Sequence, residues 1–215
     1  IESVIPPCFN YIYSPEQDQI SSILAEYGIK YVSTPFNSMQ FTTDEKPIDV
    51  GVENGIITVD RTSDWTDWDD IGSNTPREIK KSYYGAHWVN FLSSDPKDNM
   101  DVVKRWIDYF ARYKEKFDIL PAKDNAMGSA QALYKRFTKV DMQDMTMLFN
   151  FKEVNSQNVN DLSPSLYINV LNHLRPVDTD SMETSIYEKH RKYTTYKVTR
   201  HNMTSKRGTI AFQRV

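Results

Sequence analysis

The chain has 215 residues, a formal net charge of −3, and compositions of 39% hydrophobic and 13% aromatic residues. So many aromatic residues exclude a disordered chain, because disorder goes with few aromatics and little apolar surface to bury. The negative charge leaves no basic field to hold a phosphate backbone, and no apolar run approaches the ~20 residues of a membrane span, so neither nucleic-acid binding nor a membrane span is expected.

The first forty residues predict a strand, a helix and a second strand. Val4 and Ile5 belong to the first strand. Residues 14–17, Ser-Pro-Glu-Gln, are typical of a helix start, since serine caps, proline suits the first helical position and glutamine completes a capping box. Apolar residues follow at helical spacing as far as Gly28, and residues 29–33 are the second strand. Short links between these elements predict a parallel βαβ unit.

A hairpin and a long polar loop are predicted next. Residues 49–52 and 56–59 flank Asn54-Gly55, and Asn-Gly is the strongest short signal for a hairpin turn. The segment 60–74 holds five aspartates, and we interpret it as a long loop. Its carboxylates are of the type that binds calcium, but their spacing does not match an EF-hand loop, so a solvated loop is the preferred interpretation.

A second strand–helix–strand unit is predicted in the middle of the chain. A short helix is expected at residues 76–84, and a buried strand at residues 86–92. Asp95-Pro96 then opens the longest helix, and a further strand at 117–120 and a helix at 126–137 follow it. The apolar stripe of the longest helix is expected to consist of Met100, Val103, Ile107 and Phe110, and Trp106, Tyr113 and Phe117 are expected to widen it.

The periodicity changes near residue 140. Runs of β type joined by polar links follow, at residues 145–151, 165–171, 193–199 and 209–213. We therefore place a boundary at residue 141. The sequence predicts an α/β part at residues 1–140 and a β-rich module at residues 141–215.

His87 is the first candidate for a catalytic residue. It lies on a predicted strand of the α/β part, and such sheets carry their chemistry at the carboxyl ends of strands. Because the pKa of histidine lies near neutrality, His87 is suited to act as a general acid or base. The alternative is a core histidine bonded to a backbone carbonyl. The remaining histidines are expected to be structural or solvated, and they are His173, His190 and His201.

Asp60 and Arg61 are expected to pass from the predicted hairpin directly into the polar loop. Asp60 is the second catalytic candidate, and with Arg61 it presents a carboxylate and a planar donor fork to sugar hydroxyls. Trp65 supplies an aromatic face on which a sugar ring stacks. The alternatives are a surface ion pair that steadies the loop and an indole that anchors the loop to the core.

Other kinds of site have little support in the sequence. The seven glycines include no pair with the spacing of a nucleotide-binding loop, and there is no Gly-x-Ser-x-Gly nucleophile motif. Cys8 is the single cysteine, which excludes an internal disulfide and a multi-cysteine zinc site. We predict that the chain by itself binds no catalytic metal.

Two segments resemble the polysaccharide deacetylase family. Residues 6–10, Pro-Pro-Cys-Phe-Asn, precede a capped helix, and residues 24–32 match a Leu-x-Glu-x-Gly-Ile-x-x-Val strand of that family. Residues 85–88, Gly-Ala-His-Trp, resemble the late strand in which the family carries a histidine. The resemblance implies an irregular (β/α) barrel with parallel strands over residues 1–140, and removal of N- or O-acetyl groups from glycans with a divalent metal.

The sequence departs from the family at its metal site. The family uses an Asp-Asp strand end and a His-x-x-x-His helix, whereas Asp69-Asp70 lies here in a polar loop and no such helix occurs. Ile5 stands where an arginine usually precedes Pro-Pro. Because the chain begins at Ile1 without a methionine, we expect a processed chain or fragment whose metal half lies upstream, unless this lineage has lost it. The cofactor is therefore unknown. We expect a divalent metal to bind only if the upstream segment is present and acts as a partner of this chain.

The resulting functional hypothesis is a carbohydrate-active hydrolase that deacetylates a polysaccharide or glycan. The catalytic candidates are His87 and Asp60, the substrate-binding candidates are Arg61, Trp65 and Trp88, and no metal ligand is named. A carbohydrate ligand and an extracytoplasmic or secreted location go with this activity. The alternative is a non-catalytic glycan-binding or interaction protein.

Overall fold

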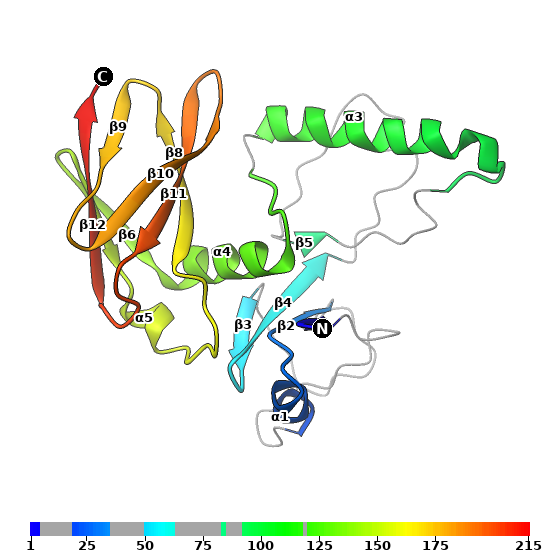
Figure 1. Ribbon diagram of the computed structural model, residues 1–215, viewed down its shortest axis with the longest axis horizontal. Helices are drawn as coiled ribbons and strands as arrows, with labels where there is room; N and C mark the ends of the chain where they lie inside the picture. Colours follow the sequence, from blue (N-terminus) through cyan, green and yellow to red (C-terminus); the bar gives the residue numbers. More distant parts are fainter. Residues whose placement is uncertain (5–18, 35–49, 63–82, 85–91, 118–119) are drawn as a thin grey trace.

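The computed structural model describes residues 1–4, 19–34, 50–62, 83–84, 92–117 and 120–215. The strands in these ranges form three sheets, with helix α4 (Asn125–Phe137) between the first sheet and the other two (Figure 1). Among the helices of these ranges, none has the length and apolar character that a membrane crossing requires.

The first sheet confirms the predicted βαβ unit. Its strands are β1 (Ser3–Val4), β2 (Tyr31–Thr34), β3 (Val50–Glu53), β4 (Ile56–Thr62) and β5 (Tyr83–Tyr84). β1 pairs with β2, β2 with β4 and β4 with β5, all in the parallel direction. Helix α1 (Gln19–Glu26) lies between β1 and β2 in the chain, as a parallel βαβ unit requires.

Gly28 ends α1 in the way that the sequence predicted. Its φ is 77°, in the left-handed region that glycine adopts without steric cost. The Gly28 N–H donates to the Ala25 carbonyl at 2.9 Å, and the Ile29 N–H donates to the Leu24 carbonyl at 3.0 Å. These two bonds form a Schellman motif, which satisfies carbonyl groups at the end of the helix.

The hairpin of β3 and β4 is also confirmed. Asn54 and Gly55 have φ values of 47° and 79°, as a two-residue turn of type I′ requires. Asn160 packs on this turn, since its N–H donates to the Gly55 carbonyl at 3.2 Å. A Cβ on Gly55 would fall on the Asn160 side chain, so both the backbone conformation and the available space require glycine here.

The predicted (β/α) barrel with parallel strands is wrong. β1, β2, β4 and β5 belong to a small sheet that β3 joins in the antiparallel direction. The strands of the described ranges divide among three such sheets, and most pairings are antiparallel. The physical reason within residues 1–140 is the Asn54-Gly55 turn, because a two-residue link joins β3 to β4 as antiparallel neighbours and is too short for the crossover that a parallel barrel repeats.

Helix α3 (Asn99–Phe117) buries only part of the predicted apolar stripe. Met100, Ile107 and Phe110 of the predicted stripe are 69%, 61% and 45% exposed. The buried side chains are those of Trp106 and Tyr113, which were expected to widen the stripe, and those of Val102 and Tyr109, which were not predicted. Both rows have the three-and-four spacing of a helical face, so the periodicity alone does not distinguish them.

Three further predictions fall wholly or partly outside the described residues. The strand expected at 86–92 lies outside them except for its last residue, and of the helix expected at 76–84 only Tyr83–Tyr84 is described, as β5. The strand expected at 117–120 begins at a residue that the structure assigns to the end of α3, and residues 118–119 are outside the description.

The core forms around α4. The Asp124 side chain caps this helix, because its Oδ1 accepts a hydrogen bond from the Met127 N–H at 2.8 Å. Leu133 and Tyr134 are among its buried residues, with exposures of 0% and 2%. One cluster of buried side chains runs from the first sheet through α4 into the C-terminal strands. The boundary at residue 141 stays a prediction, and the hydrophobic core is continuous across it.

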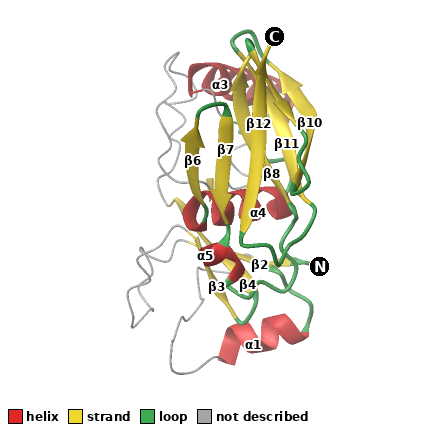
Figure 2. Ribbon diagram, turned by 90° about the vertical axis from the view of Figure 1, so that its left-hand side faces the viewer, coloured by secondary structure: helices red, strands yellow, loops and turns green. Residues whose placement is uncertain are grey.

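The C-terminal strands form two antiparallel sheets, which stand above α4 in Figure 2. One sheet consists of β6 (Lys139–Gln143), β7 (Thr146–Asn150), β12 (Arg207–Arg214) and β9 (Leu174–Val177). The other consists of β10 (Met182–Lys189), β11 (Tyr193–Arg200) and β8 (Ser165–Leu171). A single helical turn, α5 (Lys152–Asn155), follows β7. The runs predicted as strands in this half correspond to β7, β8, β11 and β12, and buried residues of both sheets meet in one core.

Lys30 connects the first sheet to the loop before β8. Its Nζ lies 2.6 Å from Asp161 Oδ2 and 3.0 Å from Glu2 Oε1. Hydrogen bonds to Asp161 and then to Glu2 raise the pKa of Lys30 above its usual value. Because these groups are exposed to solvent, we expect the ion pairs to orient the loop more than they stabilise it.

Asp178 holds the turn between β9 and β10. Its Oδ1 accepts hydrogen bonds from the Thr184 hydroxyl and from the Thr184 N–H, both at 2.7 Å. The hydroxyl bond first, and then the backbone bond, lower the pKa of Asp178 because both stabilise the carboxylate form.

We expect Asp178→Asn to lower the melting temperature near neutral pH and to lose this effect in acid. A carboxyl group with a depressed pKa in the folded chain contributes stability above its unfolded pKa, and this stability is lost as the pH falls through the folded pKa. The gap between wild type and variant should be at most about 1 kcal/mol for so exposed a group. This difference in stability should disappear as the pH falls below 3.8, which is the ordinary pKa of an aspartate side chain. Melting curves across this range measure the gap, with Asp180→Asn as the charge-matched control; a gap that persists in strong acid contradicts the assignment.

Candidate functional site

The carboxyl ends of the parallel strands meet at one edge of the first sheet. β1, β2, β4 and β5 run in the same direction, and β4 lies between β2 and β5. In Figure 1 the arrowhead of β4 points toward β5 at this edge. Ligands of sheets with parallel strands bind outside the carboxyl ends of the strands, so this edge is the candidate functional site.

Strand β4 holds this edge in place because the side chains on both of its faces are buried in the core. Ile56 packs in a small cluster with residues of α1, and Ile57 and Val59 belong to the main core. These three side chains and Thr58 are at most 1% exposed. A strand that is buried on both faces reads as a continuous apolar run, as this one does.

Asp60 and Arg61 lie on β4 itself, which corrects the prediction that they begin the polar loop. β4 continues to Thr62, so three residues of the predicted loop belong to the strand. In the register of the sheet, Asp60 is the partner of Thr34 on β2, and Arg61 is the partner of Tyr83 on β5. The backbones of both candidates are therefore at the carboxyl edge, and their side chains lie outside the description.

The other predicted site residues, Trp65, His87 and Trp88, lie outside the described residues. Trp65 is the third residue after the end of β4, and His87 is the third after the end of β5. Because β4 and β5 are parallel neighbours, the two strands end at the same edge of the sheet. The proximity of Trp65, His87 and Trp88 to Asp60 and Arg61 stays a prediction.

The donor groups required by a divalent metal do not gather in the described part of the chain. No group of three or more His, Cys, Asp or Glu side chains is present within it. A catalytic metal needs about three protein ligands. The described residues therefore do not fit the metal that the family resemblance implies, and no chemical step is derived through a metal.

The three remaining histidines take part in structural contacts of the C-terminal sheets. The His190 ring stacks on Tyr193 with a centroid distance of 4.4 Å. His201 Nδ1 lies 3.1 Å from the Asp180 carbonyl oxygen, and the His173 carbonyl accepts a bond from the Val215 N–H. The rings of His190 and His201 thus make contacts within the fold, whereas the contact of His173 is through its backbone and the role of its ring stays a prediction.

The sequence analysis did not single out two basic features of the chain, which are the buried Arg200 and the basic run at residues 189–192. Arg200 is 4% exposed, and it was overlooked because the predicted strand ended one residue before it, although its alternation with Val198 places it inward. Residues 189–192, Lys-His-Arg-Lys, are a basic run between two β-type segments. This run was a visible signal for a charged turn.

No protein-family model, curated protein or solved structure matches this chain. The likeness to polysaccharide deacetylases remains a resemblance of short segments, and functional proposals rest on the geometry of the chain.

Proposed function

We propose that this protein is a carbohydrate-active hydrolase that removes acetyl groups from a polysaccharide or glycan, with its site at the carboxyl edge of the first sheet. The observation that supports the proposal is the register of β4. It holds Asp60 and Arg61 between β2 and β5, at the edge where parallel strands carry functional groups. An extracytoplasmic or secreted location, where polysaccharides are accessible, is part of this proposal.

The residue types at this edge suit acyl hydrolysis. In that reaction water adds to the acetyl carbonyl, the C–O or C–N bond to the sugar breaks, acetate leaves, and the sugar oxygen or nitrogen takes up a proton. A carboxylate such as Asp60 or an imidazole such as His87 can remove the proton from water and return it to the leaving group. Arg61 would bind sugar hydroxyls or the developing negative charge, and the indoles of Trp65 and Trp88 would face the sugar ring.

We expect Asp60→Asn to lower the rate of acetate release from acetylated chito- or xylo-oligosaccharides by about a hundredfold or more, because it removes a proton acceptor without changing shape. Trp65→Ala should weaken glycan binding. Neither variant should change the free energy of unfolding by more than the ~0.5 kcal/mol that is usual for a surface substitution. Asp141→Asn is the matched control, since Asp141 is exposed on β6.

The outcomes separate the hydrolase from its alternative. Acetate release that Asp60→Asn abolishes supports the hydrolase. Glycan binding without acetate release in the wild-type chain overturns the proposal in favour of a non-catalytic glycan-binding protein. Equal activity in Asp60→Asn and Asp141→Asn shows that the assigned site is wrong.

A further inference from the structure

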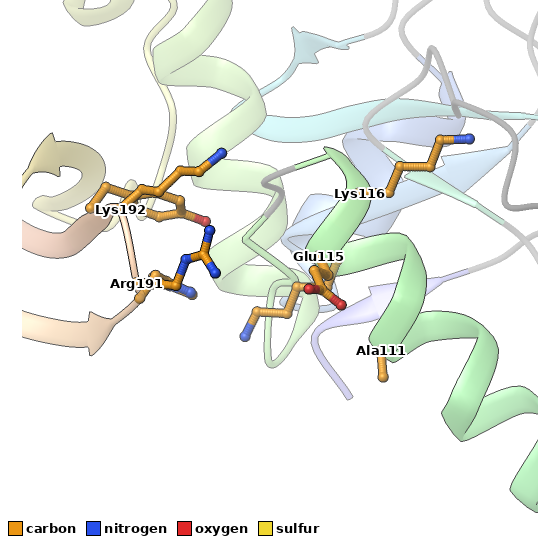
Figure 3. A pocket seen from close by; sticks show the side chains of 8 residues that line it. Ala111, Glu115, Lys116, Arg191 and Lys192 are labelled. Atoms are coloured by element: carbon orange, nitrogen blue, oxygen red, sulfur yellow. The ribbon is translucent and has the colours of Figure 1, made fainter.

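A cationic pocket lies between the C-terminal end of α3 and the turn that joins β10 to β11 (Figure 3). Its volume of about 490 Å³ is in the range of pockets that hold small organic ligands. Four of its lining side chains are lysine or arginine, and these are Lys114, Lys116, Arg191 and Lys192. Against these four cations stand two carboxylates, the lining Glu115 and Glu188, which pairs with Lys114, so positive charge is in excess here although the overall charge of the chain is −3. The pocket is thus a local concentration of positive charge.

The turn that carries two of these cations is held in place by Asn172. The Asn172 Nδ2 donates to the carbonyls of His190 and Arg191 at 3.1 and 3.0 Å, and the Asn172 N–H donates to the Lys192 carbonyl at 3.2 Å. Its Oδ1 accepts a bond from the Thr194 hydroxyl at 2.9 Å. Three successive carbonyls of the turn are therefore bonded to one residue. Such bonding fixes the turn before any ligand arrives, which reduces the entropy lost on binding.

The two walls of the pocket are joined by Glu188. Its Oε1 lies 2.5 Å from Lys114 Nζ on α3, and its Oε2 lies 3.6 Å from His190 Nε2 at the turn. Lysines in the last turn of α3 also complement the helix dipole, which is an ordinary structural role. That role accounts for Lys114 and Lys116, but it does not account for Arg191 and Lys192 on a separate element facing the same pocket.

We propose that this pocket binds an acidic carbohydrate through the carboxylates of its uronic acid units. The guanidinium of Arg191 matches a carboxylate in a bidentate geometry, and the lysines add point charges at the rim. The imidazole of His190 and the phenol of Tyr193 offer polar edges and ring surface to sugar hydroxyls and C–H groups. The negative overall charge opposes long polyanions such as nucleic acid, so a short acidic ligand that fits the pocket is favoured. The pocket shares no residue with the carboxyl edge, and the inference stands without the proposed hydrolase activity.

Calorimetric titration of the full chain with trigalacturonate at low salt tests the inference. Binding is expected for trigalacturonate and not for the neutral trisaccharide maltotriose. The double variant Arg191→Glu and Lys192→Glu should weaken the affinity roughly tenfold or more, because it reverses two charges at the pocket. The matched control is Lys206→Glu with Arg207→Glu, which makes the same charge change on exposed residues at the start of β12, outside the lining of the pocket.

A second variant separates position from charge. Asn172→Ala keeps every cation but removes the side-chain bonds that order the turn, so its affinity for trigalacturonate should fall severalfold while its unfolding midpoint changes little. Equal weakening by both charge-reversal variants would overturn the proposal, because it would reduce the effect to nonspecific attraction. The proposal would also be overturned if the wild type does not bind trigalacturonate, or if it binds inorganic phosphate but not trigalacturonate.

Discussion

Replacing Arg200 with methionine is expected to destabilise the folded chain by roughly 2–4 kcal/mol, because hydrogen-bond acceptors around it lose the donor that satisfies them. Arg200 is 4% exposed, and its Nη2 lies 3.0 Å from Asn155 Oδ1, 2.8 Å from the Met203 carbonyl and 3.0 Å from the Ser205 carbonyl. Methionine keeps an apolar stem in this space but donates to none of these acceptors. Asn155 Oδ1 and the Met203 carbonyl lose this donor, at about 1–3 kcal/mol for an acceptor left buried, whereas the Ser205 carbonyl keeps its hydrogen bond from Asn155 Nδ2.

The guanidinium of Arg200 also packs against aromatic rings of the core. Its central carbon lies 3.9 Å from the ring centroid of Phe151, a cation–π contact that is strengthened by burial. Its Nη1 donates to the Tyr134 hydroxyl at 3.5 Å, while burial raises the pKa of Tyr134 and keeps that hydroxyl protonated. Arg200 therefore ties β11 to α4, α5 and the loop before β12 through one planar group.

Urea unfolding of three variants measures the contribution of Arg200. Arg200→Lys should fall between wild type and Arg200→Met, because an ammonium group keeps the charge but loses the planar fork and its stacking. Arg214→Met, at the exposed end of β12, is the matched control and should stay within ~0.5 kcal/mol of wild type. A similarly small effect for Arg200→Met would show that the network does not stabilise the fold.

The second large effect is expected at Gly208 on β12, where alanine should destabilise the chain by about 1–3 kcal/mol through overpacking. A Cβ at this position would lie 2.6 Å from Met182 Sδ and 2.9 Å from Phe151 Cε2. Met182 is fully buried, and Phe151 stacks on Phe149 at a centroid distance of 5.7 Å, so neither side chain has room to move.

A double-mutant cycle tests this explanation. Met182→Ala alone creates a cavity and should cost about 2–5 kcal/mol. Combined with Gly208→Ala it opens the space that the new methyl group needs, so the double variant should be more stable than the sum of the two single effects by about 0.5–3 kcal/mol. Strict additivity in urea unfolding would mean that the destabilisation by Gly208→Ala has another origin.

Elements defined by local chemistry were predictable from the sequence. Gly28 ends α1, Asn54-Gly55 forms the hairpin turn, and α4, β7, β8, β11 and β12 appear close to where helical spacing and alternation indicated, whereas β6, β9 and β10 were not predicted. These features depend on residues within one or two turns of one another. Backbone conformation and short hydrogen bonds therefore determine them before any distant part of the chain is in place.

The arrangement of these elements depends on partners far apart in the chain, and there the sequence was misleading. One βαβ unit is compatible with a barrel or with an open sheet, and the strand pairings over long separations selected small, mainly antiparallel sheets. α3 carries two apolar rows, and only its packing against the rest of the fold decides which row is buried.

The candidate sites divide in the same way. The sequence by itself determined that an Asp-Arg pair follows an apolar run of residues, and that a basic run separates two β-type segments. Only the tertiary structure placed Asp60 and Arg61 between two parallel neighbours, set the basic turn against α3, and buried Arg200 in the core. The physical reason is that register, burial and the meeting of charges are properties of packed pairs of elements, whose free energies no single segment of sequence contains.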